Sequence, residues 1–325
     1  MQTESSILED ASTRDLYNRA KVLFFSGYEK DPLTLVTAVT ILQYWNPSGP
    51  SHISIHNSGY WLRIGVGLVH QMGLHKEPAP EDPHRAVKRR LFWTLFARDS
   101  LLSAGQGRPR AIHLEDCSIR WPDATDFAGS PGARAHLWVA YVKIAGILGD
   151  LTQWHLRGCP EGEIKSQSFE EQLRSWIRDL PPELRVCDVE GNMLPYDCNV
   201  RFLYLPYFTA ISILYKPRLP SGARGSPSQL ILGSTIAASC ICRIFEDALA
   251  RNEVRHGVAM QAIYLLIAGI CQLGSYGQCA SSVVLHYHRQ NLPNYRLSPA
   301  LAPVHPGAQY DHIVPPRALQ DVADG

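Results

Sequence analysis

One carboxylate in this sequence stands where a helix would be expected to show only apolar side chains. Residues 89–112 read RRLFWTLFARDSLLSAGQGRPRAI, and Asp99 falls in the middle of that stretch. With helical spacing, Leu91 and Leu95 lie on the same face as Asp99. A carboxylate in such a place either serves as an acid or base in catalysis, or is a structural charge with a partner nearby.

The sequence favours the structural role for Asp99. No second carboxylate or nucleophile accompanies it at a useful spacing, so we expect no catalytic residue here. A buried, unpaired carboxylate is costly, and Asp99 should therefore be protonated or paired with a cation. Arg108, in the loop after the helix, is the first candidate partner, and Arg98 or Arg90 is the second. We predict an internal ion pair that fastens this loop to the helix.

The loop itself, GQGRP, does not have the features of a phosphate-binding loop. Its two glycines permit a tight turn, and Pro109 fixes the backbone beside Arg108. No Gly-Lys-Ser/Thr follows, and Pro109 removes an N–H group that such a loop would use. The sequence also contains no GxSxG, HExxH or DDxxD motif. These absences argue against common hydrolases and helical terpene cyclases.

Composition indicates a globular protein without a general attraction to polyanions. The 325 residues are 45% hydrophobic and 19% charged, with a formal net charge of +1. A short basic cluster at residues 84–90 is expected to form a solvated helix face. The eight cysteines include no C-x2-C pair and no zinc-finger spacing. We therefore expect no metal ligands and no cofactor in this chain.

Helix signals dominate the sequence. Asp31 followed by Pro32 is typical of a helix start, Gly73 of a helix end, and Asp82 with Pro83 of the start of the helix that carries Asp99. No βαβ alternation is evident, and the first three helices are joined by polar loops. The fold class is therefore predicted to be all-α, as an antiparallel helical array. Further helices are expected over residues 134–156, 169–179, 199–216, 229–250 and 258–273.

Both ends of the chain differ from the rest. Residues 1–14 are acidic and rich in serine, and they lack the basic start and apolar run of a secretory signal. Residues 287–325 are rich in proline and show no periodicity. We expect disorder at both ends and one domain over residues 15–286. The apolar segment at residues 258–273 favours a central buried helix over a membrane span, because Gln261 and Gln272 interrupt it.

Residues 88–117, KRRLFWTLFARDSLLSAGQGRPRAIHLEDC, resemble the signature of the fungal-specific transcription factor domain. This domain is the helical middle region of zinc-cluster regulators. The resemblance extends over about residues 15–250 and is strongest over residues 31–122. The pair Arg98 and Asp99, with the later Glu-Asp-Cys, resembles the branch of cutinase-gene activators. The matching signature residues are Arg89, Arg90, Phe92, Trp93, Asp99, Ser103, Gly107, Arg108, Pro109, Ile112 and Asp116.

The resemblance implies a nuclear transcription regulator that is not an enzyme. Such a domain would control an activator's output by sensing a small-molecule effector or by binding other regulator chains, coregulators or a second copy of itself. The signature residues would maintain the geometry of helix and loop. Family members usually carry a six-cysteine, two-zinc cluster that grips DNA, and this sequence shows none. Zinc binding and direct DNA contact are therefore not transferred to any residue here, and membrane association is not expected.

A second interpretation belongs to another functional class. An all-α chain of this size could also be a stand-alone metabolic enzyme or a small-molecule-binding protein. That hypothesis predicts turnover, or tight ligand binding, by the isolated chain. The sequence does not determine the target genes, the effector, the direction of regulation or the oligomeric state.

Overall fold

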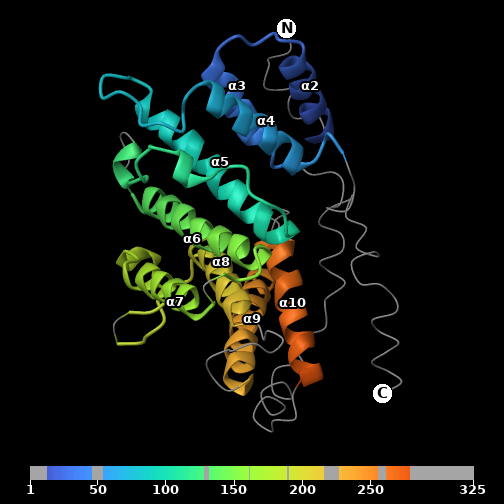
Figure 1. The fold of residues 1–325 in the computed structure, drawn as a ribbon, viewed down its shortest axis with the longest axis vertical. Coiled ribbons are helices and arrows are strands. Elements are labelled where there is room, and N and C mark those ends of the chain that lie inside the picture. The colour runs from blue at the N-terminus through green and yellow to red at the C-terminus, as the bar shows by residue number, and fades with distance from the viewer. Residues whose placement is uncertain are drawn as a thin grey trace.

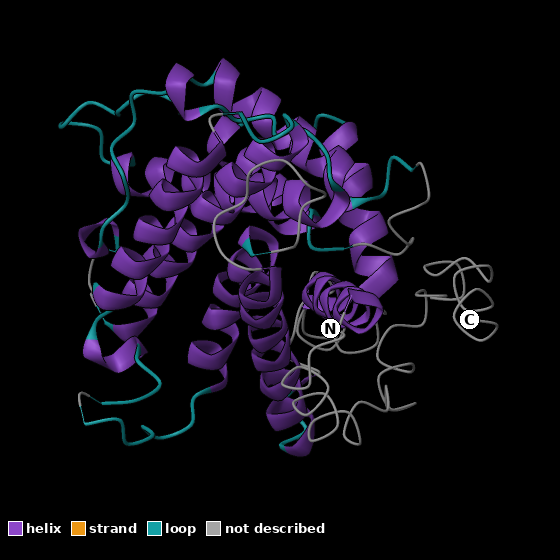
Figure 2. Ribbon diagram, turned by 60° about the horizontal axis from the view of Figure 1, so that its bottom comes forward, coloured by secondary structure: helices purple, strands orange, loops and turns teal. Residues whose placement is uncertain are grey.

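The computed structural model describes residues 13–45, 54–127, 132–160, 162–188, 190–215, 227–254 and 261–278 of the chain. Over these residues the chain forms α-helices and short 3-10 helices but no strand, apart from one isolated bridge (Figure 2). The all-α prediction is confirmed, while the antiparallel arrangement stays a prediction. The α-helices are α2 (Thr13–Phe25), α3 (Pro32–Leu42), α4 (Ser58–Gln71), α5 (Arg85–Gln106), α6 (Ala133–Leu156), α7 (Gly162–Arg178), α8 (Cys198–Leu214), α9 (Pro227–Ala250) and α10 (Gln261–Gln278); the 3-10 helices are η1 (Leu114–Asp116), η2 (Ala124–Asp126) and η3 (Pro182–Leu184).

The predicted capping signals act as expected at α3 and α4. The carboxylate of Asp31 accepts the backbone N–H of Thr34, which is otherwise without a partner in the first turn. Gly73, with φ +68°, follows the last turn of α4. The helix that carries Asp99 begins three residues later than Asp82. The carboxylate of Asp82 accepts the N–H of His84, and this turn delays the helix.

Two later helices differ from the prediction in length. α7 begins at Gly162, seven residues before the predicted start, because its first two turns are polar and carry no apolar period. α10 is predicted to be central and buried, and this is only half right. It buries Tyr264, Ala268 and Cys271, whereas Ile270 and Leu273 are exposed on its other side. None of the helices that the structure describes combines the length and apolarity needed to cross a membrane.

α5 occupies the middle of the molecule (Figure 1). α2, α3 and α4 lie on one side of it, and α6 runs beside it on the other. α8, α9 and α10 form a third group beyond α6, and α7 flanks α6. Fully buried side chains from α5 include Phe92, Trp93 and Phe96, and Leu148 and Leu151 come from α6. The helix that bears the signature is therefore the central element of the core.

The predictions for the two ends lie outside the described residues. Residues 1–12 and 279–325 are outside the described part of the chain, so the predicted disorder of these residues and the boundary at residue 286 stay predictions. Thr13 and Arg14, which fall within the predicted disordered N-terminus, form the start of α2.

The close approach of α5 and α6 depends on a glycine in α6. A Cβ placed on Gly149 would lie 2.7 Å from both Cβ and Oγ of Ser100 on α5. Such a distance is shorter than van der Waals contact, so any larger residue must push the two helices apart.

We expect Gly149→Ala to lower the free energy of unfolding by about 1–3 kcal/mol through overpacking. Gly67→Ala in α4 is the matched control, since a Cβ at Gly67 meets nothing within 4 Å. There alanine should raise stability by up to about 1 kcal/mol through its helix propensity. Urea unfolding of both variants measures the difference, and equal effects at the two positions would contradict the close packing of α5 against α6.

Candidate functional site

The two arginines at the start of the signature turn inward. Arg89 is 6% exposed, and its guanidinium forms ion pairs with Glu77 and with Asp126, the latter at 2.8 Å. Arg90 donates to the backbone carbonyl of Asp126 and lies over the ring of Phe127. The expectation of a solvated basic face is therefore wrong for Arg89 and Arg90. The reason is a pair of acidic groups from neighbouring loops that reach the first turns of α5.

A second arginine completes this charge network. Arg120 Nη2 lies 2.8 Å from Asp126 Oδ1, the oxygen that also accepts from Arg89, and its backbone N–H donates to Glu77. Burial acts to raise the pKa of Glu77, but the hydrogen bonds and charges of Arg89 and Arg120 outweigh it and lower that pKa. The hydrogen bonds that Arg89 donates to Glu77 raise the pKa of Arg89. Both groups are held in their charged forms, which fixes the loops at residues 77 and 120–126 to α5.

Trp93 holds the same loop by packing. Its side chain is 1% exposed, and its indole Nε1 donates to the carbonyl of Arg120 over 3.0 Å. Its ring stacks on Trp121 with ring centroids 4.5 Å apart. The hydrogen bond and the stacking together set the path of the chain after η1.

Asp99 accepts two hydrogen bonds from the loop backbone. Its Oδ2 lies 2.7 Å from the N of Ala111 and 2.8 Å from the N of Ile112, and the residue is 2% exposed. The predicted ion pair is wrong: among the described residues neither Arg108, Arg98 nor Arg90 pairs with Asp99. Backbone N–H groups take that place, because the loop turns back over α5 immediately after Pro109.

Burial governs the ionisation of Asp99. It raises the pKa of this carboxyl above its ordinary value of 3.8, although the two backbone hydrogen bonds and the charges of Arg63 and Arg110 act in the opposite direction. The carboxyl therefore holds its proton to higher pH than an exposed aspartate would.

The turn after α5 is held by Ser103 and by a residue of α6. Ser103 Oγ donates to the carbonyl of Arg108 over 2.5 Å and accepts from Gln153 Nε2 over 2.7 Å. Gln153 also donates to the carbonyl of Arg108. Gly107 adopts φ 61°, the left-handed conformation that ends helices and that glycine adopts without strain. The Ser and Gly of the signature thus both close the end of α5.

The remaining signature residues are less enclosed. The side chain of Arg108 is exposed, where water solvates its guanidinium and no desolvation penalty arises. The carbonyl of Pro109 accepts from Arg63 Nη2 over 3.0 Å. Asp116 is exposed in η1. The structure therefore joins Asp99, Ser103, Gly107 and Pro109 into one cluster, with Arg89, Arg90 and Trp93 in a second, while Asp116 stands apart.

A small hollow of about 280 Å³ adjoins the first cluster, between the start of α4 and the end of α5. Asp99, Ser103, Arg108 and Pro109 line it, and Asn57 and Arg63 line its other side. Ligand sites usually measure about 300–1,000 Å³. The hollow is thus at the lower limit of size for a binding site.

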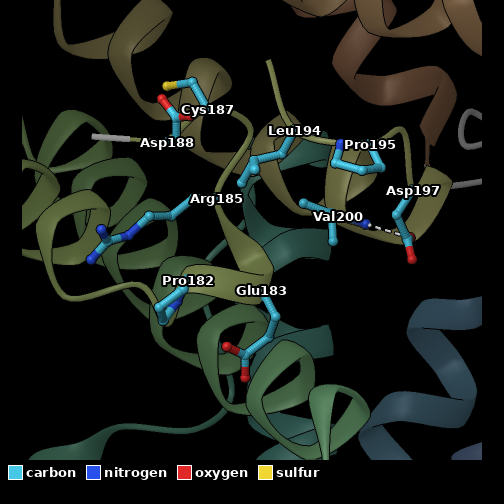
Figure 3. A pocket seen from close by; sticks show the side chains of 9 residues that line it. All are labelled: Pro182, Glu183, Arg185, Cys187, Asp188, Leu194, Pro195, Asp197 and Val200. Carbon is cyan, nitrogen blue, oxygen red and sulfur yellow. Dashed lines mark hydrogen bonds between the residues drawn. The ribbon is translucent and has the colours of Figure 1, made fainter. Parts of the chain in front are cut away.

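A larger, open pocket of about 560 Å³ lies between η3 and the start of α8 (Figure 3). Its charged side chains point in different directions, and each serves local structure. Glu183 contacts His136 at 2.6 Å, Arg185 Nε donates to the carbonyl of Leu180, and Asp197 caps α8. These groups do not converge on a common point, as acid–base or nucleophilic chemistry would require.

Several residues that complete the two clusters were not recognised in the sequence. Glu77 lies in a loop and Asp126 in the short 3-10 helix η2, and neither stands in a pattern from which the site was predicted. Arg63 is an arginine on the surface of α4, which gives no sign of a structural role. Gln153 carried a usable signal, because it is a polar residue in the apolar stretch of α6 and is 7% exposed. Such a residue must find a partner inside the protein.

Residues 1–178, more than half of the sequence, match the fungal-specific transcription factor domain. This chain belongs to that family. The prediction from the signature is therefore confirmed at the level of the family, and it was based on residues that the structure places at the centre of the fold.

Curated relatives of this family member are transcription regulators. It is 26% identical over 278 residues to cutinase transcription factor 1 alpha of Fusarium vanettenii, covering 78% of this chain and 30% of the relative. It is 29% identical over 262 residues to the acetamidase regulatory protein of Aspergillus fumigatus, covering 76% and 32%. The chain thus spans about a third of the length of these relatives. No solved structure matches it.

These relatives support the prediction of a transcription regulator and do not favour a stand-alone enzyme or ligand-binding protein.

We expect Asp99→Ala to lower the free energy of unfolding by about 2–4 kcal/mol, since the buried N–H of Ile112 and the half-buried N–H of Ala111 lose their acceptor. Asp99→Asn should cost less, because its amide oxygen can still accept. Asp116→Ala is the matched control at an exposed acid of the same signature, and it should change stability by less than about 0.5 kcal/mol. Denaturant unfolding gives all three values, and an Asp116 effect as large as that of Asp99 would contradict this difference.

The raised pKa of Asp99 predicts a pH dependence. The unfolded chain loses the proton at the ordinary value of 3.8, whereas the folded protein retains it to higher pH. The folded state then binds more protons, so the stability contributed by Asp99 falls as pH rises from 3.8 to the raised value. Measured against Asp99→Asn, the wild-type protein should lose stability over the pH interval between these two pKa values. A difference that grows in favour of the wild type over this interval would refute the assignment.

Proposed function

We propose that this chain is the regulatory region of a fungal transcription regulator and that it controls transcription without catalysing a reaction or gripping DNA itself. The family match and the names of the relatives support regulation. The single observation that carries the second part is that Lys88, Arg89 and Arg90 of the basic cluster are bound within the fold. Lys88 pairs with Asp82, and Arg89 and Arg90 bind groups of the neighbouring loops. Side chains engaged in this way are not available to phosphates.

The signature residues are proposed to act through the fold. Arg89, Arg90, Trp93 and Asp99 would hold the loops against α5, and Ser103, Gly107, Arg108 and Pro109 would close its end. Residues 15–286 would form one regulatory domain, since helices from α3 to α10 contribute side chains to a common core cluster. Regulation would follow when a contact made elsewhere on this domain changes the packing around α5.

The site of action is proposed to be the nucleus. The partners would be other regulator chains, coregulators or a second copy of this chain, and a small-molecule effector would set the activity. The identity of the family supports partners of this general kind. DNA binding and its zinc would come from a separate module.

A tethering experiment tests this function. We expect the chain, fused to an unrelated DNA-binding module in a fungal host, to change expression of a reporter that carries the cognate sites. The same chain without the fusion should leave the reporter unchanged. Asp99→Ala should abolish the effect by loosening the loop, whereas Asp116→Ala should preserve it. A tethered chain that is nuclear and folded but without effect on the reporter would argue against regulation, and DNA binding by the purified chain alone would contradict the proposed division of roles.

A further inference from the structure

The open pocket between η3 and the start of α8 has apolar walls (Figure 3). Its apolar lining comes from Pro182, Leu194, Pro195 and Val200. With a volume of about 560 Å³, it falls in the size range of sites that enclose a ligand. Apolar surface that is rimmed by polar groups is typical of places where another molecule binds.

Hydrogen bonds of the surrounding backbone fix the walls of this pocket. One wall is a hairpin turn over residues 186–194, in which the N–H of Leu194 donates to the carbonyl of Val186 over 3.0 Å. The carboxylate of Asp188 holds this turn by accepting the N–H of Asn192 over 2.9 Å. Another wall begins at Asp197, whose carboxylate caps the first turn of α8. Because the walls are already ordered, a partner that binds here loses little affinity to their ordering.

Three carboxylates lie around the apolar surface. Glu183, Asp188 and Asp197 belong to η3, to the hairpin turn and to the cap of α8, respectively (Figure 3). Among the described residues that line the pocket, Arg185 is the one cation. Its guanidinium is engaged outside the pocket, because Nε and Nη2 donate to the backbone carbonyls of residues 180 and 178. The charge that remains at the rim is negative.

Hydrogen bonds within the fold do not cancel this negative charge. Asp188 and Asp197 accept N–H groups of the backbone and of one amide side chain, all of which are neutral. Glu183 contacts the imidazole of His136 at 2.6 Å, and this group is charged only when it is protonated. The pocket therefore favours an occupant that carries positive charge.

The distribution of the carboxylates distinguishes a peptide from a small ligand. Sites for small molecules hold their ligand with a few polar groups that converge on it. Here the carboxylates are spread around an apolar centre, which is the arrangement of a protein interface with its polar rim. A negative rim also repels nucleic acids and anionic lipids, whereas it attracts lysine and arginine side chains.

We propose that this pocket is the docking site for a basic segment of a partner chain. The segment places apolar side chains against Leu194 and Val200, and its flanking lysines or arginines face Glu183, Asp188 and Asp197. The docking site rests on the function proposed above, because it supplies the chemistry by which another regulator chain or a coregulator is recognised. α8 packs against α6, and α6 packs against α5, so a segment bound here contacts the helices that share a core with the signature.

Fluorescence anisotropy of the full chain with labelled hexapeptides tests the docking site. The peptide Lys-Arg-Leu-Leu-Arg-Lys should bind saturably, because it combines an apolar centre with positive flanks. The peptide Glu-Asp-Leu-Leu-Asp-Glu keeps the centre and reverses the charge, and Lys-Arg-Ser-Ser-Arg-Lys keeps the charge and removes the centre. Each of these two should bind at least about tenfold more weakly.

A free thiol in the lining reports where the peptide binds. Cys187 is half-buried in the wall of the pocket. Lys-Arg-Leu-Leu-Arg-Lys at about ten times its Kd should slow alkylation of Cys187 by iodoacetamide about tenfold, because only the unoccupied pocket exposes the thiol. Cys117, a free and half-buried cysteine that does not line the pocket, should react at an unchanged rate.

Two variants and one control separate the contributions of charge and of apolar contact. Glu183→Lys reverses one rim charge and should weaken binding of Lys-Arg-Leu-Leu-Arg-Lys about threefold to tenfold. Glu171→Lys is the matched control at an exposed glutamate of α7 outside the lining, and it should leave binding unchanged. Val200→Ser removes apolar wall surface, so it should weaken the peptide with the leucine centre and not the one with the serine centre.

The docking site is overturned if the basic peptide with the leucine centre binds no better than the other two, or if it leaves the alkylation of Cys187 unchanged. Equal loss of binding in Glu183→Lys and Glu171→Lys would overturn it as well. Protection of Cys187 that rises with protein concentration without peptide would place a second copy of this chain in the pocket, and this too would contradict a basic partner segment.

The tethered reporter separates this docking site from the proposed function. A reporter that responds to the tethered chain while the peptide fails to bind leaves regulation intact and removes only the docking site. Peptide binding at Cys187 with a silent reporter removes the proposed function and leaves the docking site.

Discussion

The carboxylate of Asp99 determines where the chain runs after α5. By accepting the N–H groups of Ala111 and Ile112, it replaces two hydrogen bonds that these buried groups would otherwise make with water. The loop is thereby drawn back over the central helix, and Gly107 supplies the left-handed residue that allows the reversal. Ser103 donates a hydrogen bond to the carbonyl of Arg108 in this turn, and Gln153 of α6 donates to the hydroxyl of Ser103. These two bonds connect the loop to α6. The packing of the first half of the domain depends on this anchor.

At the N-terminal end of α5, two arginines of the signature likewise bind neighbouring segments to this helix. Arg89 is nearly buried, and it is tolerated there because Glu77 and Asp126 neutralise it. The two arginines at the start of the signature fasten two neighbouring segments to α5. These charged side chains are therefore committed to the fold. Arg98 is also buried, but within the described part of the chain no carboxylate forms an ion pair with it.

Helix positions and the family could be predicted from the sequence because both depend on local information. The starts of α3 and α8 follow from the side chains of Asp31 and Asp197, which cap N–H groups two or three residues later. The start of α7 was missed because its polar first turns have no apolar period. The partner of Asp99 was also missed. The sequence shows that a buried carboxylate requires a partner, and its charge made an arginine the expected one. Backbone N–H groups are present at every residue except proline, so the sequence does not mark which of them meets Asp99.

By itself the sequence determined the all-α class, an apolar helix that carries one carboxylate, and the signature of the family. These features are set by the periodicity of apolar residues and by residue types in a fixed order. Only the tertiary structure decided which groups meet: Glu77 and Asp126 with Arg89, and Gln153 with Ser103. Such pairs lie up to 50 residues apart in the sequence. Their meeting depends on the crossing of packed helices, which local spacing does not specify.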